Sequence, residues 1–229
     1  MTISRILSKR LLVVWAARFF PAVCLILLLT GCLLGSSKPS SELVYKLPTR
    51  ITLDVGETLP GTDIRYVNMG EDGAHLLIHG RPALKRKGDS LDWSGQMREG
   101  VKVDLRLRIV WFNNAQLQLL GTATVTVSNP QPRRATISTS SPIEYGGPVV
   151  YGVDRGAKIP GTTLTYEAKT DEGAKLGNTD AYPYRKIGDS IFWEGVLRDG
   201  VYLRLDVRVL QYDERHLRLG GLATIWIGN

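Results

Sequence analysis

The stretch "VKVDLRLRIVW", residues 101–111, decides the fold of this chain. Hydrophobic side chains take every second position, and lysine, aspartate or arginine takes most of the positions between them. The hydrophobic positions are Val101, Val103, Leu105, Leu107, Ile109 and Trp111. A period of two residues is typical of a β-strand with one face buried and the other in solvent. We therefore predict a strand over 101–111 with these six side chains facing inward.

The next stretch, "LQLLGTATVTV" over 117–127, repeats the pattern. Its alternate positions are Leu117, Leu119, Gly121, Ala123, Val125 and Val127. Only the short polar connection "NNAQ" separates the two stretches, which predicts an antiparallel hairpin. Because two of the inward positions are small, we expect another strand or a bulky ring to approach there, with Trp93 and Trp193 as candidates for the ring.

The whole unit recurs 100 residues later. "VYLRLDVRVL" over 201–210 matches the first strand, and "KGDSLDWSG" over 87–95 is matched by "IGDSIFWEG" over 187–195. The match runs without a gap to the last residue, and about one position in three is identical. A gapless match of this length indicates an internal duplication.

The predicted fold class is all-β, with two tandem duplicated antiparallel β-sandwich or barrel-like domains. Each copy has six or seven strand candidates between Gly-, Pro- and Asp-rich turns, and no segment after residue 40 has a helical stripe. We place the domains at 47–129 and 143–229, with a linker rich in Pro, Ser and Thr at 130–142. Each copy has a full set of inward positions, so we expect each to form its own core and to fold alone.

The N-terminus has the pattern of an export signal. Residues 1–31 carry four basic residues and no acidic one, and an apolar run ends in "LTGC" at Cys32. This run is short for a transmembrane helix, which needs about 20 apolar residues. "LTGC" resembles the lipobox of bacterial lipoproteins. The resemblance implies removal of residues 1–31, acylation of Cys32, and a lipid-anchored tether over 32–46.

The net charge and the cysteine content bear on which classes of function the sequence supports. Without the four basic residues of the signal, 25 Lys and Arg (29 − 4) face 22 Asp and Glu, a net charge of +3 that does not indicate nucleic-acid binding. Cys24 would leave with the signal and Cys32 would carry lipid, so no disulfide or thiolate metal site is expected. We expect an extracytoplasmic protein, at the outer membrane in a diderm cell or on the outer face of the cell membrane otherwise.

The string Gly88-Asp89-Ser90-Leu91 resembles the nucleophile motif of GDSL-type hydrolases, and Asp213 and His216 have the spacing that those enzymes use to complete a triad. That nucleophile lies between a strand and a helix of an α/β fold. Here no helix is expected, and the second copy keeps the same Gly-Asp-Ser, which a single active site would not require. We therefore interpret the motif as a turn in which Asp and Ser bond nearby amides, and we expect no enzyme.

Two histidines invite a metal-site interpretation. His75 and His79 would share one face of a strand but stand about 13 Å apart, too far for one ion. We therefore expect no metal and no cofactor.

Aromatic residues at the strand ends are the remaining candidates for function. They are Trp111, Phe112, Tyr182, Tyr184 and Tyr212. Such residues anchor partner proteins or stack on sugars. Our leading hypothesis is a non-catalytic, membrane-tethered protein that binds another envelope protein or forms part of a surface assembly. The alternative is a lipoprotein that binds carbohydrate or another envelope polymer. Exposed paired aromatics would favour the alternative, and an apolar patch or an unpaired edge strand would favour the leading hypothesis.

Overall fold

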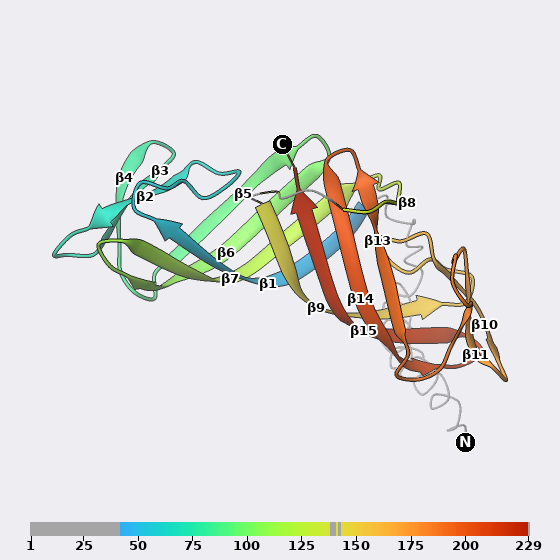
Figure 1. Cartoon of the computed structure of the whole chain (residues 1–229). Coiled ribbons are helices and arrows are strands. Elements are labelled where there is room, and N and C mark those ends of the chain that lie inside the picture. Colours follow the sequence, from blue (N-terminus) through green and yellow to red (C-terminus); the bar gives the residue numbers. More distant parts are fainter. Residues whose placement is uncertain (1–41, 138–140, 142, 229) are drawn as a thin grey trace, which may run out of the picture. The chain divides into compact units, whose positions relative to one another are not determined.

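A computed structural model describes residues 42–137, 141 and 143–228, and within this part of the chain the fold is all-β (Figure 1). No described residue is helical, so none of them belongs to a helix that could cross a membrane. The all-β prediction is confirmed. Cys32 and the predicted signal peptide lie outside the described residues.

Each copy contains one long antiparallel sheet. The first has the order β1-β7-β6-β5 and the second the order β8-β13-β14-β15-β9. The strands of the first sheet are β1 (Glu42–Asp54), β5 (Ser90–Arg98), β6 (Val101–Phe112) and β7 (Gln116–Ser128). Those of the second are β8 (Arg133–Arg134), β9 (Ile143–Asp154), β13 (Ser190–Arg198), β14 (Val201–Tyr212) and β15 (His216–Ile227). The predicted hairpin is β6–β7, and β1 begins inside the segment that we assigned to the tether.

A three-stranded sheet packs against one half of each long sheet, which makes each copy a small sandwich (Figure 1). The small sheets consist of β2 (Ile64–Met69), β3 (Ala74–Ile78) and β4 (Arg81–Lys85), and of β10 (Thr165–Thr170), β11 (Gly173–Gly177) and β12 (Tyr184–Arg185). A buried tyrosine ties the layers together in both copies. Tyr66 donates its hydroxyl hydrogen to the Asn113 carbonyl at 2.6 Å, and Tyr166 does the same to the Asp213 carbonyl.

The predicted burial pattern holds along most of β6 and fails at its end. Val101 through Ile109 are buried at every second position, as the alternation predicts. A β-bulge between Ile109 and Trp111 then shifts the strand by one residue, and Trp111 is 37% exposed. A bulge leaves one extra residue on one strand, which reverses the direction of the side chains beyond it. The prediction that Trp111 faces inward is therefore wrong.

The small residues of β7 do not receive a tryptophan ring. A side chain on Gly121 would collide with the backbone of β6 at Arg106 and Leu107, so it is the neighbouring strand that approaches closely. The two tryptophan rings lie instead over glycines of their own strands, Trp93 over Gly95 and Trp193 over Gly195. Of the two expected approaches, only that of a strand is found.

The two copies share one hydrophobic cluster. It includes the inward residues of both long sheets, and the contact between copies is reciprocal. Arg98 donates to the Gly228 carbonyl at 2.5 Å, and Arg198 donates to the Ser128 carbonyl at 2.9 Å. Tyr45 of β1 donates to the Pro160 carbonyl of the second copy at 3.3 Å. The described residues thus form one packed unit, not two separate cores as the sequence led us to expect.

Candidate functional site

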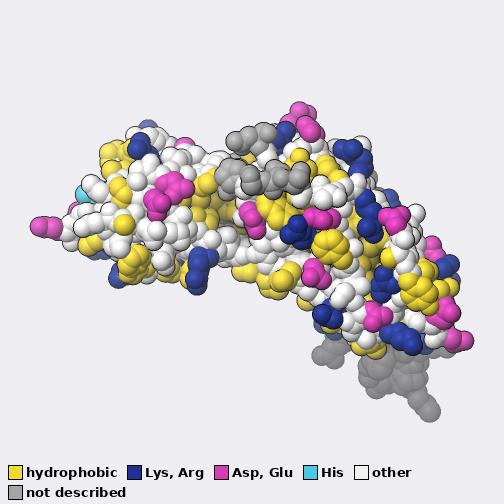
Figure 2. All heavy atoms as spheres, viewed as in Figure 1, with side chains coloured by type: hydrophobic (Ala, Val, Ile, Leu, Met, Phe, Trp, Pro, Cys, Tyr) yellow, Lys and Arg dark blue, Asp and Glu magenta, His cyan; other side chains and the backbone are white. Residues whose placement is uncertain are grey.

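The outer face of the second long sheet carries exposed hydrophobic side chains. The strand register places Phe192, Asp206, Leu222 and Pro148 in one row across β13, β14, β15 and β9. In the adjacent row Val150 lies opposite Gly220, and the Leu210 side chain lies over that glycine. We call Val150, Phe192, Leu210 and Leu222 the apolar face. Figure 2 shows hydrophobic side chains exposed among charged ones on this part of the molecule.

These side chains are too exposed to contribute much to the core. Val150 is 64%, Leu222 57% and Phe192 53% exposed. Burying apolar surface releases roughly 25 cal/mol per Å², so a molecule that covered these three side chains would gain free energy. Within the row, Asp206 separates Phe192 from Leu222.

At the other end of the same sheet face, the large aromatic and charged side chains contact one another. Trp226 is only 8% exposed because the Arg204 guanidinium lies over its ring at 5.1 Å, and its indole nitrogen donates to Glu144 at 2.9 Å. Arg204 also donates two hydrogen bonds to the Glu194 carboxylate, at 2.8 and 3.2 Å. Trp226, Arg204, Glu144 and Glu194 therefore contact one another within the sheet, unlike the side chains of the apolar face.

A hollow of about 470 Å³ opens beside the start of β13. Its lining residues are Glu172, Tyr182, Tyr184, Arg185, Lys186, Asp189 and Ser190. The rings of Tyr182 and Tyr184 have centroids 5.4 Å apart and are tilted by 58°, and Tyr182 is 64% exposed. The two predicted tyrosines therefore come together, but as an angled pair and not as a flat platform.

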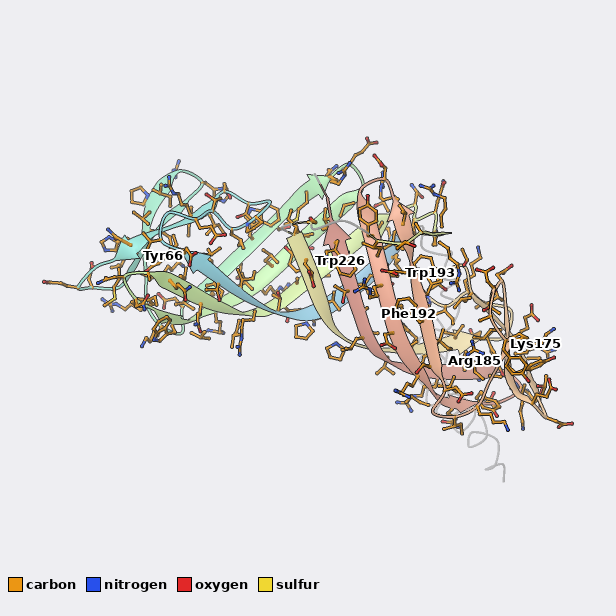
Figure 3. The ribbon with its side chains drawn as sticks, viewed as in Figure 1. Tyr66, Lys175, Arg185, Phe192, Trp193 and Trp226 are labelled. Carbon is orange, nitrogen blue, oxygen red and sulfur yellow. The ribbon has the colours of Figure 1, made fainter. Side chains whose placement is uncertain are left out.

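Arg185 is held by hydrogen bonds to backbone carbonyls around this hollow. Only part of its guanidinium is therefore available to bind a ligand. Its guanidinium donates to the carbonyls of Tyr182 and Tyr184, and its Nε donates to the Ser190 carbonyl at 3.2 Å. Lys175 of the neighbouring strand pairs with Glu167 at 2.9 Å, and this pairing raises the pKa of Lys175. Figure 3 shows Lys175, Arg185 and Phe192 in the same part of the second copy.

The other predicted aromatic residues belong to the hairpin ends. Phe112 and Tyr212 are half-buried and pack against the core. Lys87 lies over the Phe112 ring at 6.0 Å. Within the described residues no ring contact joins Trp111, Phe112 or Tyr212 to the tyrosine pair of the hollow.

The Gly-Asp-Ser motif forms the predicted turn in both copies. Gly88 and Gly188 have φ values of 90° and 91°, in the region that favours glycine. Asp89 accepts a hydrogen bond from the Arg86 amide at 2.8 Å, and Asp189 accepts one from the Lys186 amide at 2.7 Å. The described residues offer no hydrogen-bond partner to either serine hydroxyl, so only the aspartates act as we expected.

Each of the three histidines lies within ion-pair distance of an aspartate side chain. His216 lies 3.3 Å from Asp154, and Asp213 accepts hydrogen bonds from the amides of Arg215 and His216 at the hairpin tip. His75 lies 3.0 Å from Asp72. His79 is not part of β3 but of the turn after it, with a φ of 52°, so the expectation that it shares a strand face with His75 is wrong. In the described ranges no three His, Cys, Asp or Glu side chains gather as a metal site would require.

The apolar face was missed from the sequence although a signal for it was present. Three of its four outward positions differ between the copies: Arg50, Asp92 and Thr122 in the first correspond to Val150, Phe192 and Leu222 in the second, whereas Leu210 corresponds to the exposed Val110. The outward positions of residues 102–108 and 202–208 are mostly polar in both copies, so the signal lies in the other strands of the sheet.

Comparison with known proteins gives no relative: no protein family, no curated protein and no solved structure matches this chain.

Proposed function

We propose that this chain is a non-catalytic, lipid-anchored envelope protein that binds a partner protein through the apolar face of its second copy. The observation that carries the proposal is the exposure of Val150, Phe192 and Leu222 on a sheet at whose other end Trp226 is covered by Arg204. Outward hydrophobic residues cost solubility in a monomer, and a partner that covers them removes that cost.

The duplication supports this proposal because it supplies an internal reference. Both copies keep the inward residues that a sandwich needs, and only the second has hydrophobic residues at three outward positions where the first is polar. Packing within the fold does not require these residues, because the first copy forms the four corresponding strands in the same order without them.

The direct test replaces three residues of the apolar face by the residues at the equivalent positions of the first copy. The variant Val150→Arg, Phe192→Asp, Leu222→Thr installs the residues of the first copy at equivalent positions. A photo-reactive amino acid at Leu210, beside the face, is expected to give one discrete cross-linked protein in intact cells, and the triple variant is expected to lose it. The same photo-reactive residue at Val110, the equivalent position in the first copy, is the control. An identical cross-link from Val110, or one that survives the exchange, would refute the proposal.

The membrane anchor is a separate part of the proposal, and it rests on the resemblance of "LTGC" to a lipobox. Intact-mass analysis is expected to show loss of residues 1–31 and added acyl mass on Cys32. Cys32→Ser is expected to leave an unprocessed precursor. A mature protein that still begins at Met1 would contradict the anchor but not the partner-binding face.

A second candidate function is binding of an envelope polymer, and the pair of exposed Tyr182 and half-buried Tyr184 favours it. Tyrosine rings stack on sugar faces and their hydroxyls bond to sugar hydroxyls. Co-sedimentation with purified peptidoglycan sacculi tests it. If the hollow binds glycan strands, Tyr182→Ala should abolish co-sedimentation while Phe112→Ala, at a ring packed on the core, should not.

A further inference from the structure

The two copies differ at one edge of their long sheets. In the second copy the outer edge of β13 is paired with the linker: Gly195 lies opposite Arg134 and Val196 opposite Arg133. In the first copy the corresponding edge is that of β5, and no described strand pairs with it. The same structural position is therefore covered in one copy and bare, as far as the described residues go, in the other.

The linker covers its edge through backbone hydrogen bonds. The Gln131 amide donates to the Leu197 carbonyl at 2.7 Å, and the Ala135 amide donates to the Glu194 carbonyl at 3.3 Å. By the matching register of β5, the equivalent acceptors in the first copy are the carbonyls of Ser94 and Met97. Such a row of backbone acceptors is a template for another extended segment.

Burial of the neighbouring side chains follows this difference. Trp193 and Leu197 are both 0% exposed, whereas their counterparts Trp93 and Met97 are only half-buried. Trp193 also donates from its indole nitrogen to Thr163 at 3.2 Å. A tryptophan left partly in water beside an uncovered strand edge gains buried area when a segment pairs there.

The glycine at the centre of the edge leaves room for that segment. At Gly195 an added side chain would collide with the carbonyl oxygen of Arg133, so the close approach of the linker requires glycine. At the equivalent residue, Gly95, the three atoms nearest to an added side chain all belong to the ring of Trp93, and none is backbone. Among the described residues, no backbone lies as close to Gly95 as the linker lies to Gly195.

The β5 edge also lacks the features that protect the other edges. β1 and β9 carry Pro48 and Pro148, and proline on an edge strand discourages pairing. Between Trp93 and Met97 there is no proline and no charge. A hollow of about 410 Å³ begins at Ser94 and Gln96 and extends across the outer face of the sheet over Lys102 and Thr126, so it adjoins this segment on one side only.

We propose that the β5 edge from Trp93 to Met97 binds an extended segment of a partner protein that has no proline at its two amide-donating positions. This segment adds to the sheet as an antiparallel strand and covers Trp93 and Met97 with an apolar side chain. The geometry is the one that the linker adopts on β13. Backbone bonds supply affinity in this mode of recognition, and alternate side chains supply specificity. This site lies on the first copy and is independent of the apolar face.

The linker itself provides the probe. A synthetic peptide with the sequence of residues 129–137, "NPQPRRATI", has the backbone that fits the equivalent edge. Added to the mature protein, it is expected to change the fluorescence of Trp93 and to slow hydrogen exchange at the amides of β5. A peptide with proline in place of Gln131 and Ala135 lacks the two donating amides and is expected to bind at least tenfold more weakly.

A protein variant provides the second arm. Gly95→Val puts a side chain against the Trp93 ring and into the space that the linker backbone occupies at Gly195, so it is expected to abolish peptide binding. Gly152→Ala, at a position with open space around it and a φ that does not require glycine, is expected to leave binding unchanged. Thermal unfolding of each variant shows whether it is folded. If the peptide fails to bind the folded wild type, or binds Gly95→Val equally well, the proposal is overturned.

Other occupants of the edge have distinct signatures that would also overturn it. A disulfide formed in the full chain between Leu33→Cys and Gln96→Cys would show that the chain's own N-terminal segment lies there. A concentration-dependent dimer that Gly95→Val abolishes would show that a second copy of this chain does. In cells, a photo-reactive residue at Gln96 is expected to cross-link a protein other than this chain, and one at Val196, on the covered edge, is not.

Discussion

The tryptophans of the two copies show how one sequence motif gives two environments. Trp93 and Trp193 follow the same Gly-Asp-Ser turn and lie over equivalent glycines. Trp193 is completely buried because the linker pairs with its strand, and Trp93 is half-buried because no described segment does so. Burial of the tryptophan therefore depends on the segment that pairs with its strand and not on the Gly-Asp-Ser motif.

The largest effect is expected when the second copy is separated from the first. Residues 139–229 alone are expected to lose cooperative folding, because Tyr45 and Leu43 fill the space over Gly161 and the cores are continuous. Circular dichroism and thermal unfolding of this fragment, with residues 41–229 as the control, check the expectation. A cooperative transition in the fragment would mean that each copy is stable alone after all.

Replacing each tryptophan by alanine measures how much its burial contributes to the free energy of unfolding. Trp193→Ala is expected to lower the free energy of unfolding by about 3–5 kcal/mol, the usual effect for a fully buried tryptophan. Trp93→Ala is expected to cost clearly less, because part of that ring is already in water. Urea denaturation of both variants measures the difference. Equal losses would contradict the assigned difference in burial.

Alkaline pH tests the contact between the copies through their buried tyrosines. Burial raises the pKa of Tyr145 and of Tyr151 to about 12, from 10.0. The unfolded chain loses these protons near pH 10 while the folded protein keeps them, so the stabilisation is complete below pH 10 and is lost as pH rises towards 12. A shift of this size corresponds to about 3 kcal/mol for each tyrosine.

The control for this experiment replaces both residues by phenylalanine. Unfolding midpoints in urea between pH 8 and pH 12 are expected to fall less steeply in Tyr145→Phe, Tyr151→Phe than in the wild type. Tyr151→Phe is also expected to be tolerated at pH 7, because the Tyr151 hydroxyl is buried and has no hydrogen-bond partner of good geometry among the described residues. An unchanged slope would show that these tyrosines are accessible to solvent.

The smallest effects are expected at the turn that both copies share. Ser90→Ala and Ser190→Ala should each change the unfolding free energy by about 0.5 kcal/mol or less, since neither hydroxyl bonds to a described residue. Asp89→Ala and Asp189→Ala should cost more, about 1 kcal/mol, because each carboxylate accepts an amide hydrogen bond. Turnover of a short acyl ester that disappears only in Ser90→Ala would restore the hydrolase interpretation of the motif.

The alternation of the long strands and the Gly-Asp-Ser turn could be read from the sequence alone. The two-residue alternation in residues 101–111 is a local property, because successive side chains of any strand point to opposite faces, and the structure buries that face from Val101 to Ile109. The Gly-Asp-Ser turn was equally predictable, since glycine at positive φ and an aspartate that bonds to a nearby amide act within four residues.

Only the tertiary structure decided how the copies meet, where Trp111 points and which sheet edge is covered. The reciprocal bonds of Arg98 and Arg198 join residues 130 and 70 positions apart in the sequence, and alternation carries no information about such contacts. A bulge of one residue redirects Trp111, and the pairing of Arg133 and Arg134 with β13 depends on the path of a linker that has no strand pattern of its own. Local periodicity fixes which face of a strand is hydrophobic, whereas the neighbour that covers this face or edge is set by packing across the whole molecule.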